Sequence, residues 1–106
     1  MTSFKRISAN DAKTLMAQGN SQIIDIRDAM SFQVNHIANA TRVDNDNISQ
    51  FMAQADLDAP LIVCCYHGNS SQGAANYFAE QGFKNACSLD GGFEQWKVMY
   101  PEACES

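Results

Sequence analysis

The chain has 106 residues, a formal net charge of −5 at pH 7 and only seven Lys and Arg residues. Phosphate contacts need clustered basic side chains, so this composition argues against a nucleic-acid partner. The length predicts a single domain over residues 1–106 with one modest core. No basic segment precedes an apolar one, and no apolar run approaches the roughly 18 residues of a membrane span. We therefore expect a cytoplasmic protein with no membrane partner.

The first part of the chain predicts a strand, a helix and a second strand. Residues 5–7 end in an apolar side chain and predict a short strand. Ser8 is suited to cap a helix that ends near Gly19. Residues 22–26 predict a second strand, covered on both faces of a sheet. The inward face of the helix consists of Ala12, Leu15 and Met16.

The middle of the chain is rich in turn residues. Within it, residues 29–36 predict a short helix and residues 40–43 a short strand. A further helix begins at Ile48 and ends before the segment 56–60, which closes with a proline. The apolar positions of that helix are Ile48, Phe51, Met52 and Ala55.

The last part of the chain continues the alternation. Residues 61–65 form an apolar run and predict the central strand, and residues 70–81 predict the helix that follows. Residues 86–89 predict the last strand, and a turn at 90–92 leads into a final helix. Strands that alternate with helices over short loops predict an α/β fold with a mainly parallel sheet and helices on both faces. The apolar stripe of the final helix is Phe93, Trp96 and Tyr100.

Cys65 is the most informative residue of the chain. It stands at the end of the predicted central strand, and a short loop separates it from the next helix. Unpaired backbone N–H groups of that loop, together with the positive helix end, would favour a thiolate. Lowering a thiol pKa by two units takes about 2.7 kcal/mol, of which a helix end supplies at most about 2. Each N–H bond to a charged sulfur adds about 1.5–3 kcal/mol, so we expect the loop backbone to activate Cys65 more than any side chain.

The other three cysteines show no ligand or catalytic pattern. Cys64 should face the side of the strand opposite to Cys65 and pack in the core. The four cysteines have no Cys-x-x-Cys spacing, so we expect no metal site and no structural disulfide. The sequence assigns no role to Cys87 or Cys104. We expect Cys104, in the acidic tail, to be exposed.

Four motifs in order resemble one known family. Asp25-Ile26-Arg27 resembles the Asp-x-Arg that ends the second strand of rhodaneses, and residues 35–40 resemble their Gly-His-Ile-x-Gly-Ala stretch with Asn at both glycine positions. Asn tolerates positive φ, so that turn stays feasible. Residues 65–71, Cys-Tyr-His-Gly-Asn-Ser-Ser, are similar to the active loop of the single-domain bacterial members. Residues 90–96 resemble the carboxyl-terminal Gly-Gly-aromatic-x-x-Trp motif.

The resemblance to the rhodanese family implies a rhodanese-like fold, namely a five-stranded mainly parallel sheet flanked by helices. It also implies a thiosulfate:cyanide sulfurtransferase that needs no cofactor. Cys65 would be the catalytic nucleophile that accepts the sulfane sulfur of thiosulfate as a persulfide. The acceptor would be cyanide or a cellular dithiol such as thioredoxin. The residues expected to bind substrate, mainly through backbone N–H groups, are Tyr66, His67, Gly68, Asn69 and Ser70.

The remaining polar residues of the motifs have expected supporting roles. Asp25 and Arg27 should pair and hold the end of the second strand, and His36 should anchor its turn. His67 is either a cationic partner of the thiolate and guide for the acceptor or a solvated loop residue. We expect Ser70 and Ser71 to cap the helix after the loop. The loop carries no Arg or Lys, so the substrate anion should be held weakly.

Three other functions remain open at this level. Phosphatases and arsenate reductases of related fold place five residues and then Arg after the cysteine, but Ser71 stands at that position here. An oxyanion in phosphoryl transfer would lose its main charge stabilisation without this guanidinium. An inactive rhodanese-like interaction module would usually lack the cysteine. A persulfide carrier in a sulfur relay would keep the same chemistry and differ only in its acceptor.

Overall fold

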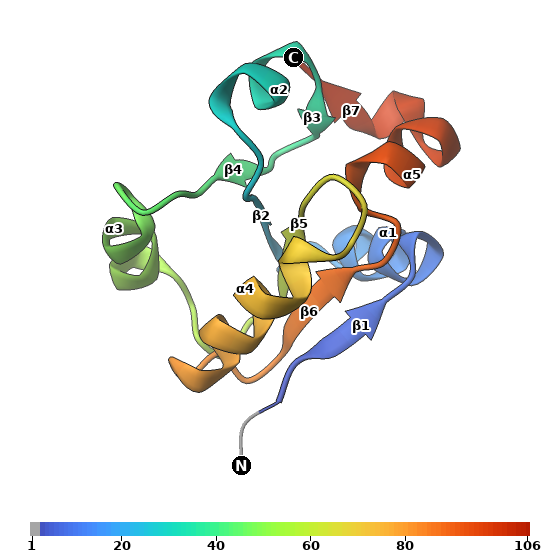
Figure 1. Cartoon of the computed structure of the whole chain (residues 1–106). Coiled ribbons are helices and arrows are strands. Elements are labelled where there is room, and N and C mark those ends of the chain that lie inside the picture. The colour runs from blue at the N-terminus through green and yellow to red at the C-terminus, as the bar shows by residue number, and fades with distance from the viewer. Residues whose placement is uncertain (1–2) are drawn as a thin grey trace.

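The computed structural model describes residues 3–106 and contains a five-stranded sheet at its centre (Figure 1). All the strand pairs are parallel, and the strand order is β1-β6-β5-β2-β4. Helices lie on both faces of the sheet, which confirms the predicted fold class. The strands are β1 (Lys5–Ile7), β2 (Gln22–Asp25), β4 (Thr41–Arg42), β5 (Leu61–Cys64) and β6 (Ala86–Leu89).

Two apolar cores, one on each face of the sheet, hold the helices in place. Side chains alternate along β5, so Leu61 and Val63 enter one core, while Ile62 and Cys64 enter the other. The first core is covered by α3 (Ile48–Gln54) and α4 (Ser70–Glu80), and the second by α1 (Ala9–Ala17) and α5 (Gly92–Met99). The prediction that Cys64 packs in the core is therefore confirmed.

Most of the predicted elements appear with small shifts at their ends. The strand predicted over 22–26 ends at Asp25, and the strand predicted over 61–65 ends at Cys64. Ser8 caps α1 as predicted, because its Oγ accepts a hydrogen bond of 3.1 Å from the N–H of Asp11. Within residues 3–106, no helix has both the length and the apolar character needed to cross a membrane.

Two segments, residues 29–37 and residues 101–105, depart from the prediction. The expected helix over 29–36 stops early, as α2 (Ala29–Val34), because Asn35 is extended and the following residues form strand β3 (His36–Ile37). A short helix η1 (Pro101–Ala103) leads into strand β7 (Cys104–Glu105), which pairs with β3 in an antiparallel two-stranded sheet. The strand at 86–89 is therefore not the last one.

Cys104 is a further correction. It was expected to be exposed, but it is partly buried against the second core. Its backbone pairs with Ile37, and its thiol lies 3.5 Å from the carbonyl oxygen of Tyr100. The pairing partner is distant in sequence, so the local acidic composition around Cys104 gave no sign of it.

Candidate active site

Cys65 directly follows β5 and therefore stands at the carboxyl edge of the parallel sheet. The loop that joins β5 to α4 begins there (Figure 1). Sγ of Cys65 accepts hydrogen bonds from the backbone N–H groups of Gly68, at 3.2 Å, and Ser71, at 3.3 Å. The residue is only 3% exposed. The loop thus curves around the sulfur and directs backbone donors at it, and these donors form a cradle for the thiolate.

A side chain also contributes to this cradle, and the sequence interpretation missed it. The Ser71 hydroxyl lies 3.2 Å from Sγ and 2.7 Å from the hydroxyl of Ser88 in β6. Ser70 and Ser71 were expected to cap α4, but both lie inside the helix, the N-cap residue is Asn69 and no side chain makes the capping hydrogen bond. The available signal was Ser88 itself, since a hydroxyl inside the apolar segment 86–89 needs a buried partner.

These hydrogen bonds change the acidity of the thiol. Burial by itself raises the pKa of Cys65, but the hydroxyl of Ser71 and the N–H groups of Ser71, Gly68 and His67 stabilise the thiolate and lower the pKa below its ordinary value. By contrast, burial raises the pKa of Cys64 well above that value, and the pKa values of Cys87 and Cys104 are also raised. Cys65 is therefore the one cysteine of the four with an activated thiol.

This difference gives a testable pH dependence. Because the pKa of Cys65 is lowered by folding, the folded protein keeps a thiolate at a pH where the unfolded chain holds mainly thiol. We expect alkylation of Cys65 by iodoacetamide to fall as the pH drops, with a midpoint lower in the native than in the urea-unfolded protein. Peptide mass spectrometry across a pH series would measure both midpoints. A native midpoint equal to or above the unfolded one would contradict the cradle.

The start of α5 holds the loop from outside. The N–H of Phe93 donates to the carbonyl oxygen of Cys65 at 2.8 Å, and the N–H of Glu94 donates to that of Tyr66 at 3.1 Å. The contact is so close that a Cβ on Gly92 would lie 2.5 Å from the carbonyl of Tyr66. The Gly-Gly-aromatic motif therefore forms one wall of the candidate site.

Gly68 is the point where the loop turns back against this wall. Its φ is +92°, and a Cβ there would lie 2.9 Å from the backbone nitrogen of Gly91. Both the positive φ and the close approach require glycine. The N–H of Gly68 is thereby fixed in direction toward the sulfur.

Arg27 and Asp25 form a buried pair beneath the loop. Nη2 of Arg27 lies 2.7 Å from Oδ2 of Asp25, and Nη2 also donates to the carbonyl oxygen of Asn35 at 2.8 Å. The guanidinium carbon lies 4.3 Å from the centre of the Phe93 ring and 5.8 Å from that of Tyr66. The pair therefore joins the end of β2 to Asn35 after α2 and places the guanidinium against the ring of Phe93 in α5.

His36 lies further from the thiol, at the turn after α2. Its Nδ1 is 2.7 Å from the carbonyl oxygen of Phe32, and the two rings are stacked with their centres 3.7 Å apart. Nε2 lies 3.5 Å from a carboxylate oxygen of Glu105 in β7. These contacts join α2 to the small sheet and do not reach Cys65.

The other predicted loop residues present their side chains to solvent. Tyr66 is exposed, and its hydroxyl bonds to the carboxylate of Asp28, which caps α2. Within residues 3–106, the side chains of His67, Asn69 and Ser70 make no hydrogen bond to Sγ. Of these three residues, His67 lowers the pKa of the thiol through its backbone N–H.

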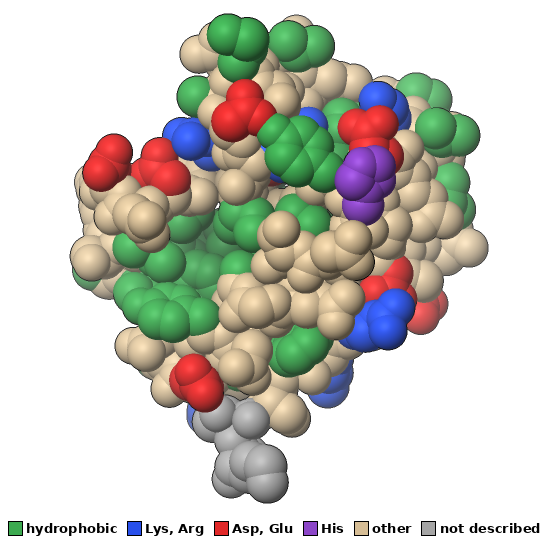
Figure 2. Space-filling model, in the orientation of Figure 1, with side chains coloured by type: hydrophobic (Ala, Val, Ile, Leu, Met, Phe, Trp, Pro, Cys, Tyr) green, Lys and Arg blue, Asp and Glu red, His purple; other side chains and the backbone are tan. Residues whose placement is uncertain are grey.

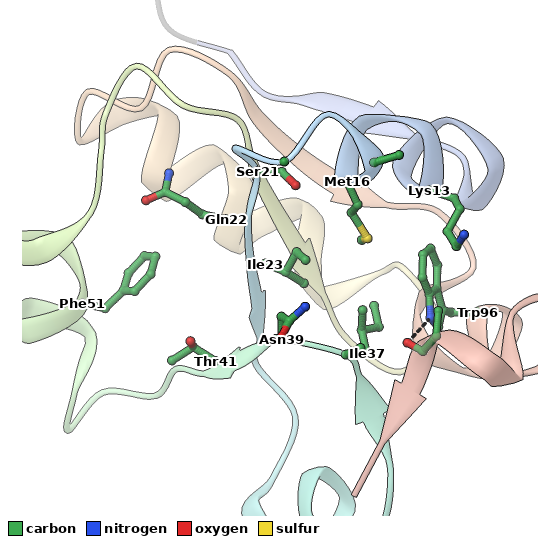
Figure 3. Close-up of a pocket in the computed structure, with 14 residues that line it drawn as sticks. Lys13, Met16, Ser21, Gln22, Ile23, Ile37, Asn39, Thr41, Phe51 and Trp96 are labelled. Atoms are coloured by element: carbon green, nitrogen blue, oxygen red, sulfur yellow. Dashed lines mark hydrogen bonds between the residues drawn. The ribbon is translucent and has the colours of Figure 1, made fainter.

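The larger hollows of the molecule lie away from the thiol. An apolar hollow of about 510 Å³ opens between α3 and α4, where Figure 2 shows hydrophobic side chains gathered in a depression. A cavity of about 610 Å³ lies over the other face of the sheet, between Met16, Ile23, Ile37 and Trp96 (Figure 3). Neither is lined by Cys65 or its loop. A smaller depression of about 410 Å³, lined partly by Tyr66 and Phe93, adjoins the loop.

The chemistry of the site follows from these contacts. Backbone donors and one buried hydroxyl converge on a single sulfur, so the site stabilises a negative charge at that point. In the part of the chain that the structure describes, no group of three or more His, Cys, Asp or Glu side chains is placed to hold a metal ion. A parallel α/β sheet that presents one cysteine at its carboxyl edge, with N–H and O–H donors around the sulfur, is typical of proteins with an activated cysteine.

Comparison with known proteins places the chain within this class. The family model of the rhodanese-like domain matches residues 8–99, so the chain belongs to the rhodanese-like domain family. A protein of Pseudomonas savastanoi named thiosulfate sulfurtransferase GlpE is 53% identical over 102 residues, which cover 96% of this chain and 95% of that protein. A protein of the same name from Pseudomonas aeruginosa is 54% identical over 98 residues, covering 92% of this chain and 88% of the relative.

Solved structures agree at the level of the fold. The reduced CoADR-RHD protein of Bacillus anthracis superposes with a TM-score of 0.80 at 19% identity, covering 97% of this chain and 18% of that one. A rhodanese-related protein of Thermoplasma volcanium superposes with a TM-score of 0.76 at 21% identity, covering 91% and 93% of the two chains. At these identities the superpositions show a shared fold and say nothing about the substrate.

Proposed function

We propose that this protein is a thiosulfate sulfurtransferase that works as one domain over residues 1–106, with Cys65 as its nucleophile. The observation that carries the proposal is the convergence of the Gly68 and Ser71 N–H groups and the Ser71 hydroxyl on the Cys65 sulfur. Relatives of this name that are more than half identical over nearly the whole chain support the same activity.

The first half-reaction loads the enzyme. The Cys65 thiolate attacks the outer sulfur of thiosulfate and forms a new sulfur–sulfur bond. The original sulfur–sulfur bond breaks, and its electron pair leaves with sulfite. One negative charge remains on the terminal sulfur of the persulfide, so charge is balanced without proton transfer. The loop N–H groups that stabilise the thiolate are placed to stabilise this charge as well.

The second half-reaction returns the thiolate. Cyanide, or a thiolate of a cellular dithiol such as thioredoxin, attacks the terminal sulfur, and the bonding electrons return to Cys65 Sγ. Cyanide leaves as thiocyanate. The depression beside the loop is open to solvent, which suits an acceptor that approaches the loop from outside. The backbone groups proposed to line the bound anion belong to Tyr66, His67, Gly68, Asn69 and Ser70.

Intact mass spectrometry tests the proposal directly. Incubation of the reduced protein with thiosulfate should add the mass of one sulfur atom, and subsequent cyanide should remove it with release of thiocyanate. The other thiols should stay unloaded, because their pKa values are raised rather than lowered. A protein that gains no mass from thiosulfate would not be a thiosulfate sulfurtransferase, and other sulfur donors would then be tried.

The phosphatase alternative finds no support in the structure. The residue at the position of the expected Arg is Ser71, whose side chain is fully buried and contacts Sγ and Ser88. It cannot reach outward to clamp a phosphate. Turnover of p-nitrophenyl phosphate should therefore be absent from the same protein preparation.

A further inference from the structure

We infer that Ser88 is a positioning residue for the reaction at Cys65: its hydroxyl donates to Ser71 Oγ and thereby aims the single hydroxyl proton of Ser71 at the sulfur. For its catalytic consequence this inference rests on the proposed function. The hydrogen-bond order itself rests only on the contacts of Ser88, Ser71 and Cys65.

Ser88 occupies a position where packing alone would favour an apolar side chain. It lies in β6, paired with Val63 of β5 and Arg6 of β1, and is fully buried. Ala86, two residues earlier and so on the same face of β6, belongs to the apolar core beneath α4. A hydroxyl in such surroundings needs a hydrogen-bond partner. Among residues 3–106 the partner of its hydroxyl is Ser71, with the two oxygens 2.7 Å apart.

Counting protons fixes the direction of these hydrogen bonds. Each serine hydroxyl carries one hydrogen, and a thiolate carries none. When Cys65 is ionised, the 3.2 Å contact between Ser71 Oγ and Sγ requires Ser71 to donate. Ser71 then has no hydrogen left for Ser88, so the 2.7 Å contact requires Ser88 to donate to Ser71. The order Ser88 to Ser71 to sulfur is the only one consistent with a thiolate.

Without the Ser88 hydroxyl, Ser71 would lose the donor that occupies its oxygen. Ser71 is fully buried, so water does not replace that donor. A hydroxyl that accepts one hydrogen bond is also a better donor in the next, because chained hydrogen bonds polarise each other. Ser88 therefore acts on the thiolate through Ser71 and has no hydrogen bond of its own to Sγ.

The hydrogen bonds from Ser88 to Ser71 and from Ser71 to Sγ matter most when the negative charge of the proposed reaction lies on Sγ. Negative charge sits on Sγ in the free thiolate and returns to Sγ when the acceptor removes the terminal sulfur. In the persulfide the charge lies on the terminal sulfur instead. The two serines therefore stabilise Cys65 as the attacking group in the first half-reaction and as the leaving group in the second.

A double-mutant cycle tests the inference through the pH profile of Cys65 alkylation by iodoacetamide. This measurement needs no thiosulfate, so failure of the proposed function would leave it readable. We expect S88A to raise the alkylation midpoint and to slow alkylation about 3- to 10-fold at a pH one unit below the native midpoint. S71A should have an effect at least as large, and S71A/S88A should match S71A alone.

Two results would overturn the inference: an unchanged midpoint in S88A, or shifts of S71A and S88A that add in the double variant. Cys87→Ala is the matched control, because Cys87 is a buried neighbour of Ser88 on the opposite face of β6. It should leave the midpoint unchanged. If S88A does not fold, S88T and S88V are compared instead, because their side chains are nearly isosteric with each other and only threonine keeps the hydroxyl. The valine variant should then show the higher midpoint, and equal midpoints would overturn the inference.

Discussion

Replacement of Cys65 by serine should abolish sulfur loading and thiocyanate production while leaving the fold intact. A serine hydroxyl does not ionise near neutral pH and cannot form the persulfide. The loop should keep its shape, because backbone contacts hold it. These are the N–H groups of Phe93 and Glu94 on the carbonyl oxygens of Cys65 and Tyr66, together with the positive φ of Gly68.

For C65S, the intact mass after incubation with thiosulfate would measure sulfur loading, and the circular dichroism melting curve would show whether the fold is kept. Cys104→Ser is the matched control, since it removes a partly buried thiol that has a raised pKa and lies outside the active loop. That variant should load one sulfur as the wild type does. Thiocyanate production by C65S at the wild-type rate would show that Cys65 is not the nucleophile.

Replacement of Gly92 by alanine should destabilise the protein by about 3–6 kcal/mol and disrupt the thiolate cradle. The new Cβ would lie 2.5 Å from the carbonyl carbon and oxygen of Tyr66 and 2.6 Å from the carbonyl oxygen of Cys65. These are backbone atoms and cannot rotate away, so α5 or the loop must move. Such a shift would break the N–H bonds from Phe93 and Glu94 to the loop.

The effect of G92A is best measured against Gly19→Ala. Gly19 also has a positive φ, at +93°, but a Cβ there would meet nothing within 4 Å. Its replacement should cost only the backbone strain, about 1–2 kcal/mol. Urea unfolding would give both stabilities, and the Cys65 alkylation profile would report the cradle. Equal costs for the two variants would show that the close approach of α5 to the loop does not matter.

Local patterns in the sequence were enough to predict the fold class and to single out Cys65 as the cysteine with an activated thiol. The alternation of apolar strands with helical stripes predicted the parallel sheet, because the side-chain periods of strands and helices are carried by neighbouring residues. The position of Cys65, between an apolar run and a helix, predicted that backbone N–H groups would surround the sulfur. The structure places the N–H groups of Gly68 and Ser71 there.

Only the tertiary structure decided the contacts between segments that are distant in the chain. The hydrogen bond between Ser88 and Ser71, the packing of α5 on the active loop and the pairing of Cys104 with Ile37 each join elements that are not neighbours in sequence. Such contacts depend on the order and register of strands, and no local period encodes these. The sequence by itself therefore predicted which cysteine would have an activated thiol, and the folded chain determined which distant groups contact that thiol and lower its pKa.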